Sequence, residues 1–301
     1  MRWLWFARLT WVALPVAGAG ALGDALDQRS SAVANTVAAI AYLAWGLGLV
    51  ALFAPRPWGL TVLRVLAPVV AAAGVVLLVS EGTIAIPAAV IGILAAFLAL
   101  GPHYAQAAGN ALAYGDETRF PLRIPLPLLA IAVPIAIALI AGAVIAPPLL
   151  FAAEETVLGA VIAVIGLPIA AFLARALHQL STRWLVLVPA GVTLVDPLML
   201  TEPVLIRRAR VHVLSRFPHP LADGATDLRL GAPGGLLLAT NEPVELGRRR
   251  GRSGAALVKT AAMLLAPVRA NALLEDAARR RIPTRQAAES AMPPPSTTSP
   301  S

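Results

Sequence analysis

The sequence predicts an all-α membrane bundle of about six transmembrane helices, followed by a small β domain that one helix closes. Three observations predict this. The mean hydropathy is +0.77, with 58% hydrophobic and only 13% charged residues, whereas soluble domains average about 25% charged residues. Uncharged apolar runs long enough to cross a bilayer recur up to about residue 180. From Thr182 onward the apolar residues come in short runs, several of them alternating, which is typical of strands.

The clearest apolar run lies between Val157 and Ala174, which carries no charge. About 20 helical residues, each rising ~1.5 Å, cross the ~30 Å hydrocarbon core. The same reasoning predicts spans near residues 3–23, 31–54, 59–79, 83–100, 126–146 and 157–177, with Pro147-Pro148 ending the fifth. Residues 1–180 are therefore expected to form the transmembrane domain, in which 101–125 is the longest loop.

The first span has two interpretations. Basic residues near its start and the small residues 19–21 (A-G-A) resemble a signal peptide with its cleavage site. Alternatively the segment is an uncleaved span, with Trp3, Trp5 and Trp11 as interfacial anchors. We favour the uncleaved span, because many further spans follow and need no separate signal.

Arginines predict the orientation. Eight of them fall at one set of span ends, against Arg29 alone on the other side: Arg2, Arg8, Arg56, Arg64, Arg119, Arg123, Arg175 and Arg183. We therefore expect a multi-pass protein of the plasma membrane. By the positive-inside rule, both of its termini lie in the cytoplasm. Cleavage after Ala21 would leave five spans and the same location for the C-terminal domain. These arginines explain much of the net charge of +8, so we expect no nucleic-acid partner.

Several chemistries find no support. The chain has no cysteine, which excludes disulfides and thiolate chemistry. Adjacent Asp116 and Glu117 beside Arg119 could form a catalytic pair, but such loop residues are more often a solvated charge cluster. No nucleophile, Walker A or dinucleotide motif is present. The four histidines lack ligand spacing: His103, His178, His212 and His219. We therefore expect no metal, no cofactor and no enzyme activity.

The C-terminal region, residues 182–282, reads as strands closed by a helix. Expected strands are 184–188 and 192–196 as a hairpin, 204–214, 227–230 and 236–240 as a second hairpin around the turn 231–235, 244–246, and 258–266. An arginine-rich loop at 247–254 precedes the last strand. Asn271 is expected to cap a helix that ends near Arg281. Residues 283–301, with three consecutive prolines, are expected to be a disordered tail.

This pattern resembles a pleckstrin-homology-like (PH-like) domain. The residues that carry the resemblance are RWLVLVPAGVTLVDPL (183–198), VLIRRARVHVL (204–214) and MLLAPVRANALLEDA (263–277). The whole chain resembles uncharacterised bacterial polytopic membrane proteins with a C-terminal domain of this kind. The resemblance implies a binding or scaffolding module more than an enzyme, and it transfers no functional residue.

The basic residues of this region are the candidate binding site. Arg208, Arg210 and His212 share one face of the expected strand 204–214, and the loop 247–254 adds Arg248, Arg249, Arg250 and Arg252. Close to an anionic leaflet each charge adds ~1 kcal/mol of attraction; otherwise these residues only solubilise the domain.

We expect a non-catalytic membrane scaffold or sensor whose partners include membrane lipids. Its PH-like domain is expected to bind either acidic lipid headgroups or a cytoplasmic protein partner. The alternative is a transporter or channel component, favoured by six spans that contain prolines; an intramembrane enzyme ranks third. The sequence leaves the oligomeric state open.

Overall fold

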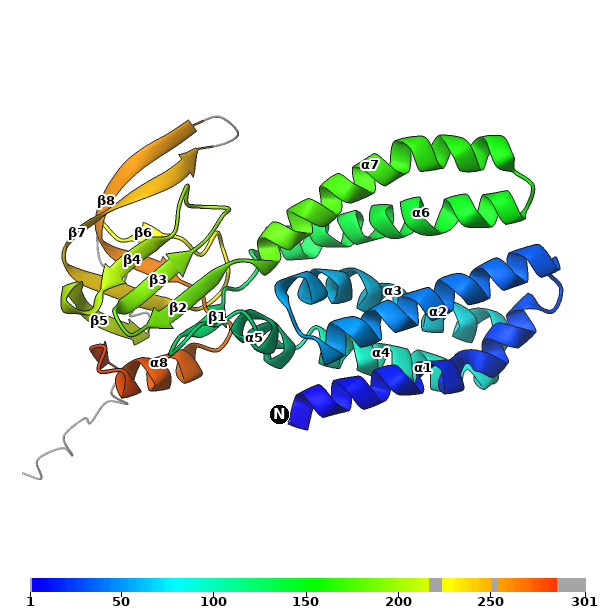
Figure 1. The fold of residues 1–301 in the computed structure, drawn as a ribbon, viewed down its shortest axis with the longest axis horizontal. Coiled ribbons are helices and arrows are strands. Elements are labelled where there is room, and N and C mark those ends of the chain that lie inside the picture. Colours follow the sequence, from blue (N-terminus) through cyan, green and yellow to red (C-terminus); the bar gives the residue numbers. More distant parts are fainter. Residues whose placement is uncertain (1, 217–223, 251–253, 286–301) are drawn as a thin grey trace, which may run out of the picture.

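A computed structural model describes residues 2–216, 224–250 and 254–285 of the chain. Figure 1 shows two parts, a bundle of long helices and a β region stacked against one end of it. We call that end of the bundle the β-side end and the opposite one the far end.

The described part of the bundle contains α1 (Arg2–Leu26), α2 (Ser31–Phe53), α3 (Pro57–Glu81), η1 (Gly82–Ala85), α4 (Ile86–Ala99), η2 (Leu128–Ala132), α6 (Val133–Ala152) and α7 (Thr156–Ser181). Within the described residues, five segments are long and apolar enough to cross a membrane: Arg2–Leu26, Ser31–Phe53, Pro57–Ala99, Leu128–Ala152 and Thr156–Ser181. Helix α6 continues past Pro147 and Pro148 to Ala152. The expected end of that span at the proline pair is therefore wrong, because neighbouring helices and local backbone adjustment let a membrane helix tolerate proline.

The segment Pro57–Ala99 folds back on itself. Gly82 has φ +68° and begins the short helix η1 (Gly82–Ala85) between α3 and α4, a conformation that glycine adopts without steric cost. The two helices pack closely, since a Cβ on Gly74 would lie 2.8 Å from the Ala88 carbonyl oxygen. Gly92 lies against Val70 in the same way. The reversal brings both ends of this segment to the β-side end (Figure 1).

Helices α1 and α2 are joined by two tryptophans. The indole of Trp11 donates to the Trp45 carbonyl, and the indole of Trp45 donates to the Trp11 carbonyl, both at 2.9 Å. Trp11 is fully buried against Gly48. Helix α1 is thus an integral member of the bundle.

The β region contains two sheets. The first has the order β1-β2-β3-β4 and is antiparallel throughout; the second has the order β6-β8-β7-β5-β9. The strands are β1 (Thr118–Pro121), β2 (Trp184–Val188), β3 (Gly191–Val195), β4 (Val204–Arg207), β5 (Val211–Arg216), β6 (Thr226–Asp227), β7 (Leu236–Arg250), β8 (Gly254–Leu265) and β9 (Thr284–Arg285).

Strands β2 and β3 form the expected hairpin, but three other expectations are corrected. The short helix η3 (Arg208–Arg210) interrupts the expected strand 204–214. Strand β6 pairs with β8 in parallel, not with β7 as a hairpin. Strand β7 runs without a break through 244–246 into the arginine-rich segment, and a register shift between Ala239 and Val244 absorbs the extra residues. Local alternation does not identify the partner of a strand, and bulges disguise its continuity.

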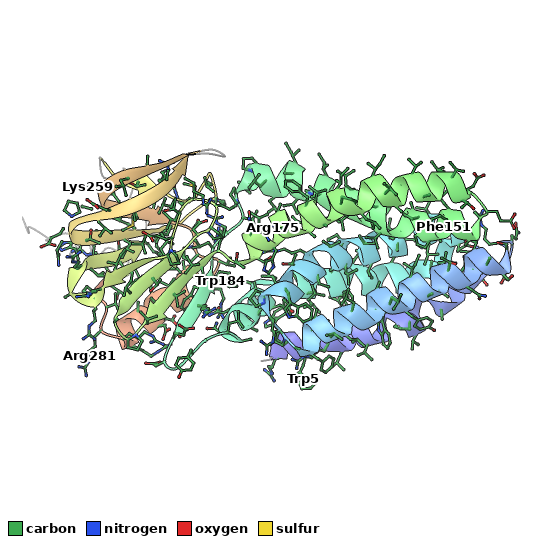
Figure 2. The ribbon with its side chains drawn as sticks, turned by 45° about the horizontal axis from the view of Figure 1, so that its top comes forward. Trp5, Phe151, Arg175, Trp184, Lys259 and Arg281 are labelled. Atoms are coloured by element: carbon green, nitrogen blue, oxygen red, sulfur yellow. The ribbon has the colours of Figure 1, made fainter. Side chains whose placement is uncertain are left out.

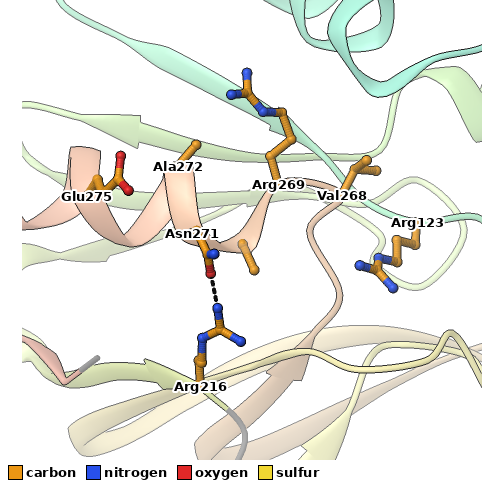
Figure 3. A pocket seen from close by; sticks show the side chains of 8 residues that line it. Arg123, Arg216, Val268, Arg269, Asn271, Ala272 and Glu275 are labelled. Carbon is orange, nitrogen blue, oxygen red and sulfur yellow. Dashed lines mark hydrogen bonds between the residues drawn. The ribbon is translucent and has the colours of Figure 1, made fainter. Parts of the chain in front are cut away.

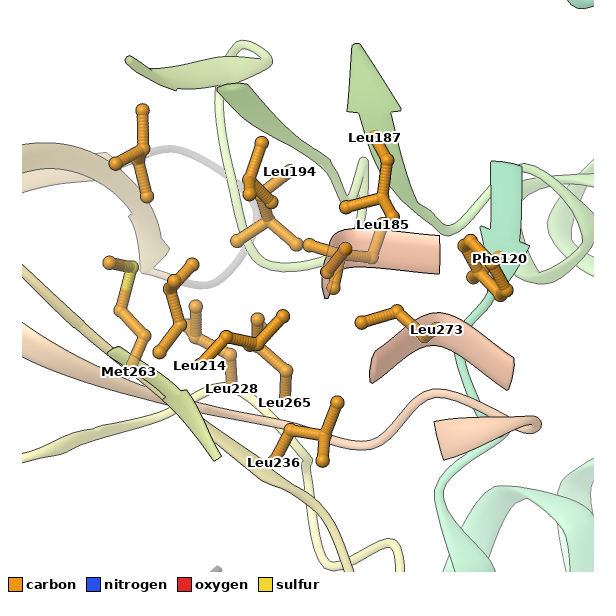
Figure 4. Close-up of a cluster of buried hydrophobic side chains, with 14 of the residues drawn as sticks. Phe120, Leu185, Leu187, Leu194, Leu214, Leu228, Leu236, Met263, Leu265 and Leu273 are labelled. Carbon is orange, nitrogen blue, oxygen red and sulfur yellow. The ribbon is translucent and has the colours of Figure 1, made fainter. Parts of the chain in front are cut away.

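The core of the β region is rich in leucine and lies between the sheets and α8 (Ala270–Arg279) (Figure 4). Leu273, Leu274 and Ala277 of α8 are buried in it. The helix begins one residue before Asn271, after Arg269, and no side chain caps it. Asn271 is therefore not the N-cap, and its side chain accepts a hydrogen bond from Arg216 instead.

The segment expected to be a loop, 101–125, joins the two parts of the molecule. It contains helix α5 (Pro102–Asn110) and strand β1, which adds the buried Phe120 to the β core. On the bundle side, the Tyr104 hydroxyl donates to the Ala51 carbonyl at 2.6 Å. On the other side, the Trp184 ring of β2 lies directly against Gly109. The β region is thus fastened to the bundle by buried contacts.

Candidate basic surface at the bundle end

The two ends of the bundle differ in charge. The far end carries the acidic turn residues Glu81, Glu154 and Glu155, whereas arginines gather at the β-side end. Arg8 is an example, because its guanidinium lies 4.9 Å from the ring centres of both Trp5 and Phe53 and donates to the Leu52 carbonyl. Such an arginine, stacked on interfacial aromatic rings, is typical of the headgroup level of a membrane.

The outer half of the β7–β8 hairpin, residues 246–250 and 254–258, holds three of the arginines predicted for the 247–254 loop. Its register pairs Arg248 with Ala256 and Arg250 with Gly254. Figures 1 and 2 show the end of the hairpin that contains these pairs directed toward the bundle, on the side of α6 and α7. Lys259 lies farther from the bundle (Figure 2). Arg249 is exposed and Arg248 half-buried; the side chain of Arg250 and the whole of Arg252 lie outside the described residues.

The base of this hairpin half is held in place. Arg249 donates its backbone N–H to the Met199 carbonyl at 2.8 Å and its Nε to the Leu200 carbonyl at 3.0 Å. Thr201 donates its backbone N–H to the Gly247 carbonyl at 2.8 Å. Leu257, opposite Gly247, is 76% exposed. Basic residues and an exposed leucine therefore stand together on a supported hairpin.

Arg208, Arg210 and His212 do not form the predicted stripe on one strand face. Arg208 and Arg210 belong to the turn η3, and only His212 lies on a strand. Arg210 lies 3.8 Å from the carboxylate of Glu242, and His212 contacts Asn241. Glu242 and Arg248 are six positions apart along β7, which corresponds to about 20 Å of extended chain. The predicted site residues thus fall into two separate groups.

A buried ion pair at the junction of α7 and β2 was missed from the sequence. Arg183 donates from Nε and Nη2 to the two carboxylate oxygens of Asp196, at 2.9 and 2.6 Å, and both side chains are at most 1% exposed. Arg183 also donates to the Arg123 carbonyl, and Asp196 accepts from the backbone N–H of Leu198. The signal was present, because a hairpin that pairs Trp184 with Val195 places the next residues, 183 and 196, opposite one another.

A polar cluster between α3 and α7 was also missed. Arg64 was expected only to mark a span end, but its guanidinium donates to the Ser181 hydroxyl. Thr61 lies 2.9 Å from His178 Nδ1 and 3.1 Å from Ser181 Oγ. These four side chains fasten the β-side ends of the two helices together.

The carboxylates weighed as a catalytic pair are held by arginines. Asp116 pairs with Arg280 at 3.0 Å, and Glu117 pairs with Arg119 at 2.7 Å. Burial opposes ionisation of Glu117, but hydrogen bonds from the Tyr114 backbone N–H and from Arg119 outweigh it and lower its pKa. Within the described residues, no three His, Cys, Asp or Glu side chains are placed to hold a metal ion.

Comparison with protein-family models, with curated proteins and with solved structures finds no match to this chain.

Proposed function

We propose that the chain is an integral plasma-membrane scaffold or sensor whose PH-like β region binds acidic lipid headgroups at the cytoplasmic surface. The observation that carries the proposal is the attachment of a β region with a basic hairpin to the β-side end of an apolar bundle. The buried contacts of Tyr104 and Trp184 limit how far this region can move from the membrane.

The proposal includes six crossings with both termini on one side. Five segments have the length and hydropathy to cross, and the fold-back at Gly82 divides one of them into two antiparallel passes. The second pass is short, but η1 and α4 together cover about 29 Å at ~2.0 and ~1.5 Å per residue. Arginines at the β-side end support a cytoplasmic location of that end.

Retention of α1 follows from the same packing. Cleavage after Ala21 would remove Trp11, which fills the space beside Gly48 and exchanges two hydrogen bonds with Trp45. We therefore propose an uncleaved first span.

The assignment of the β region as PH-like is supported by two sheets and a C-terminal helix packed into the core between them. Strand β1 comes from a segment before α7, so a fragment that begins at residue 182 lacks this strand and Phe120. Binding experiments therefore need the full chain.

Hydrogen exchange on the full chain in nanodiscs tests the proposal. We expect residues 246–250 to exchange more slowly in discs that contain phosphatidylglycerol than in pure phosphatidylcholine, and high salt to abolish the difference. The double variant Arg248→Glu/Arg249→Glu should lose the difference. Lys259→Glu is the control, because it reverses a charge on the part of the same hairpin that lies farther from the bundle, and should keep it.

Equal exchange in both lipids would contradict headgroup binding by the hairpin. The same surface would then be tested as a docking site for a protein partner.

A further inference from the structure

A second basic site lies where the β region meets the bundle, around the start of α8. A cavity of about 450 Å³ is lined by arginines from three separate parts of the chain: Arg123 after β1, Arg216 at the end of β5, and Arg269 before α8. None of the residues predicted from the sequence as the binding site lines it.

The three arginines of this cavity donate to neutral acceptors. Arg123 donates to the Pro233 carbonyl at 3.1 Å, Arg269 to the side-chain oxygen of Gln106 at 2.9 Å, and Arg216 to the Asn271 side chain. All three acceptors are neutral. Within the described residues, no carboxylate lies in salt-bridge distance of the three guanidinium groups, although most other arginine contacts in the β region use one.

Figure 3 shows how these groups face the cavity. The guanidinium groups of Arg123 and Arg216 lie on either side of the hollow beside the first turn of α8, whereas Arg269 turns away toward the bundle. The acidic lining residue, Glu275, lies one turn farther along α8. The backbone N–H groups of that first turn have no side-chain cap, which adds donors to the same hollow.

The cavity is located at the level expected for lipid headgroups. Ile124, next to Arg123, packs with the α6–α7 cluster that includes Ala136 and Leu177. Only four residues separate Arg123 from Leu128, where the apolar segment Leu128–Ala152 begins. Gln106, the partner of Arg269, lies on α5, which packs on the bundle. Two of the three arginines are therefore attached directly to parts of the chain that contact the membrane bundle.

We propose that this cavity binds the phosphate of an anionic phospholipid headgroup. Two guanidinium groups that face one hollow match the oxygens of a phosphate, which arginine binds by paired hydrogen bonds. A lipid source is favoured over a free phosphate because the cavity stands so close to the start of α6. The inference rests on the proposed membrane orientation and deepens the proposed headgroup binding, but it uses residues separate from the hairpin.

Native mass spectrometry of the full chain in detergent tests this site. The probes are short-chain phosphatidic acid, short-chain phosphatidylcholine and inorganic phosphate. We expect phosphatidic acid adducts to form, and to weaken roughly tenfold or more in Arg216→Gln and in Arg123→Gln, because each loses a charged hydrogen bond. Arg216→Lys, which keeps the charge, should retain more binding than Arg216→Gln.

Two controls separate this inference from the hairpin proposal. Arg248→Glu/Arg249→Glu should bind the short-chain lipid as the parent chain does, whereas Arg216→Gln should keep the lipid-dependent protection of the hairpin. A thermal unfolding curve without lipid checks that each variant is folded.

Equal phosphatidic acid binding by the parent chain and both glutamine variants would overturn the site. Inorganic phosphate binding as strongly as phosphatidic acid would overturn its assignment to a lipid. Either result leaves the hairpin measurement intact, so the two proposals fail independently.

Discussion

The bundle and the β region are held together by different kinds of contact. Alanine is the commonest residue in the bundle interior, as at Ala51, Ala67 and Ala99, and glycines let the helices approach closely. The interior of the β region is mostly leucine, and it also contains the fully buried Arg183–Asp196 pair. Lipid tails are as apolar as the side chains of a membrane helix, so moving these side chains out of lipid gains little free energy. Close packing of the backbones therefore drives the association of the helices. In water, burial of large apolar side chains drives it.

The outer surfaces differ in the same way. Val16, Val79 and Val157 of the bundle are each at least 80% exposed. Among the described residues of the β region from Trp184 onward, the exposed large apolar side chains are Leu205 and Leu257. The bundle is thus built for a lipid surrounding, whereas Leu257 is an apolar exception beside the basic end of the hairpin.

The largest expected effect comes from the buried ion pair. Arg183→Met leaves the Asp196 carboxylate buried without its partner, which should lower the free energy of unfolding of the β region by about 3–5 kcal/mol. Denaturant unfolding of the full chain in micelles, followed by pulsed hydrogen exchange of the peptides that cover β2 and β3, measures it. Arg183→Met/Asp196→Leu removes both charges and should recover much of the loss; a double variant as unstable as the single one would contradict the account.

Phe120→Ala tests whether a strand from the helical half belongs to the β core. We expect a loss of about 3 kcal/mol, the low end for a buried phenylalanine, because β1 is an edge strand. The same unfolding measurement applies. Tyr114→Ala changes an aromatic residue of the same segment that is 90% exposed and should leave stability unchanged; similar losses in both variants would mean that β1 does not contribute as described.

Within the bundle, two glycines of α2 form a matched pair. A Cβ on Gly48 would lie 2.1 Å from the Trp11 ring, whereas a Cβ on Gly46 meets nothing within 4 Å. Gly48→Ala should therefore destabilise the bundle by about 1–3 kcal/mol through overpacking, and Gly46→Ala should not. Thermal unfolding followed by helical circular dichroism compares them, and an equal effect of both substitutions would contradict the packing of α1 on α2.

The smallest effect concerns an exposed ion pair on the hairpin. Lys259 and Glu245 lie 3.0 Å apart but are 72% and 56% exposed, so solvent screens their attraction. Glu245→Gln should change the free energy of unfolding by less than about 0.5 kcal/mol in the same denaturant experiment. A loss near that of Arg183→Met would show that burial does not decide the strength of these pairs.

The contrast between the bundle and the β region also explains which features could be predicted from the sequence. The apolar helices were predictable because an uncharged run such as Val157–Ala174 has few alternatives to a membrane helix. The hairpin of β2 and β3 was predictable because its strands are adjacent and its turn is local. The pairing of β1 with β2 joins residues more than 60 positions apart, and no local pattern specifies it.

The candidate site was predicted only in part. Arginine composition identified Arg248 and Arg249, but the alternation that grouped Arg208 and Arg210 with His212 was misleading, because a turn can interrupt a run of alternating residues. Arg123, Arg216 and Arg269 are far apart in the sequence, and only the folded chain brings them to one cavity.

The most direct test of the central claim measures the depth of the hairpin at the membrane surface. The chain has no cysteine, so single cysteines at Ala255 and Arg281 can carry spin labels in the otherwise unchanged chain. Arg281 lies at the end of the β region away from the bundle (Figure 2). In nanodiscs with anionic lipid, we predict that a water-soluble nickel reagent reaches the label at 255 less than in neutral discs, and the label at 281 equally in both. Equal access at 255 in the two lipids would contradict the claim that the hairpin rests on an acidic membrane surface.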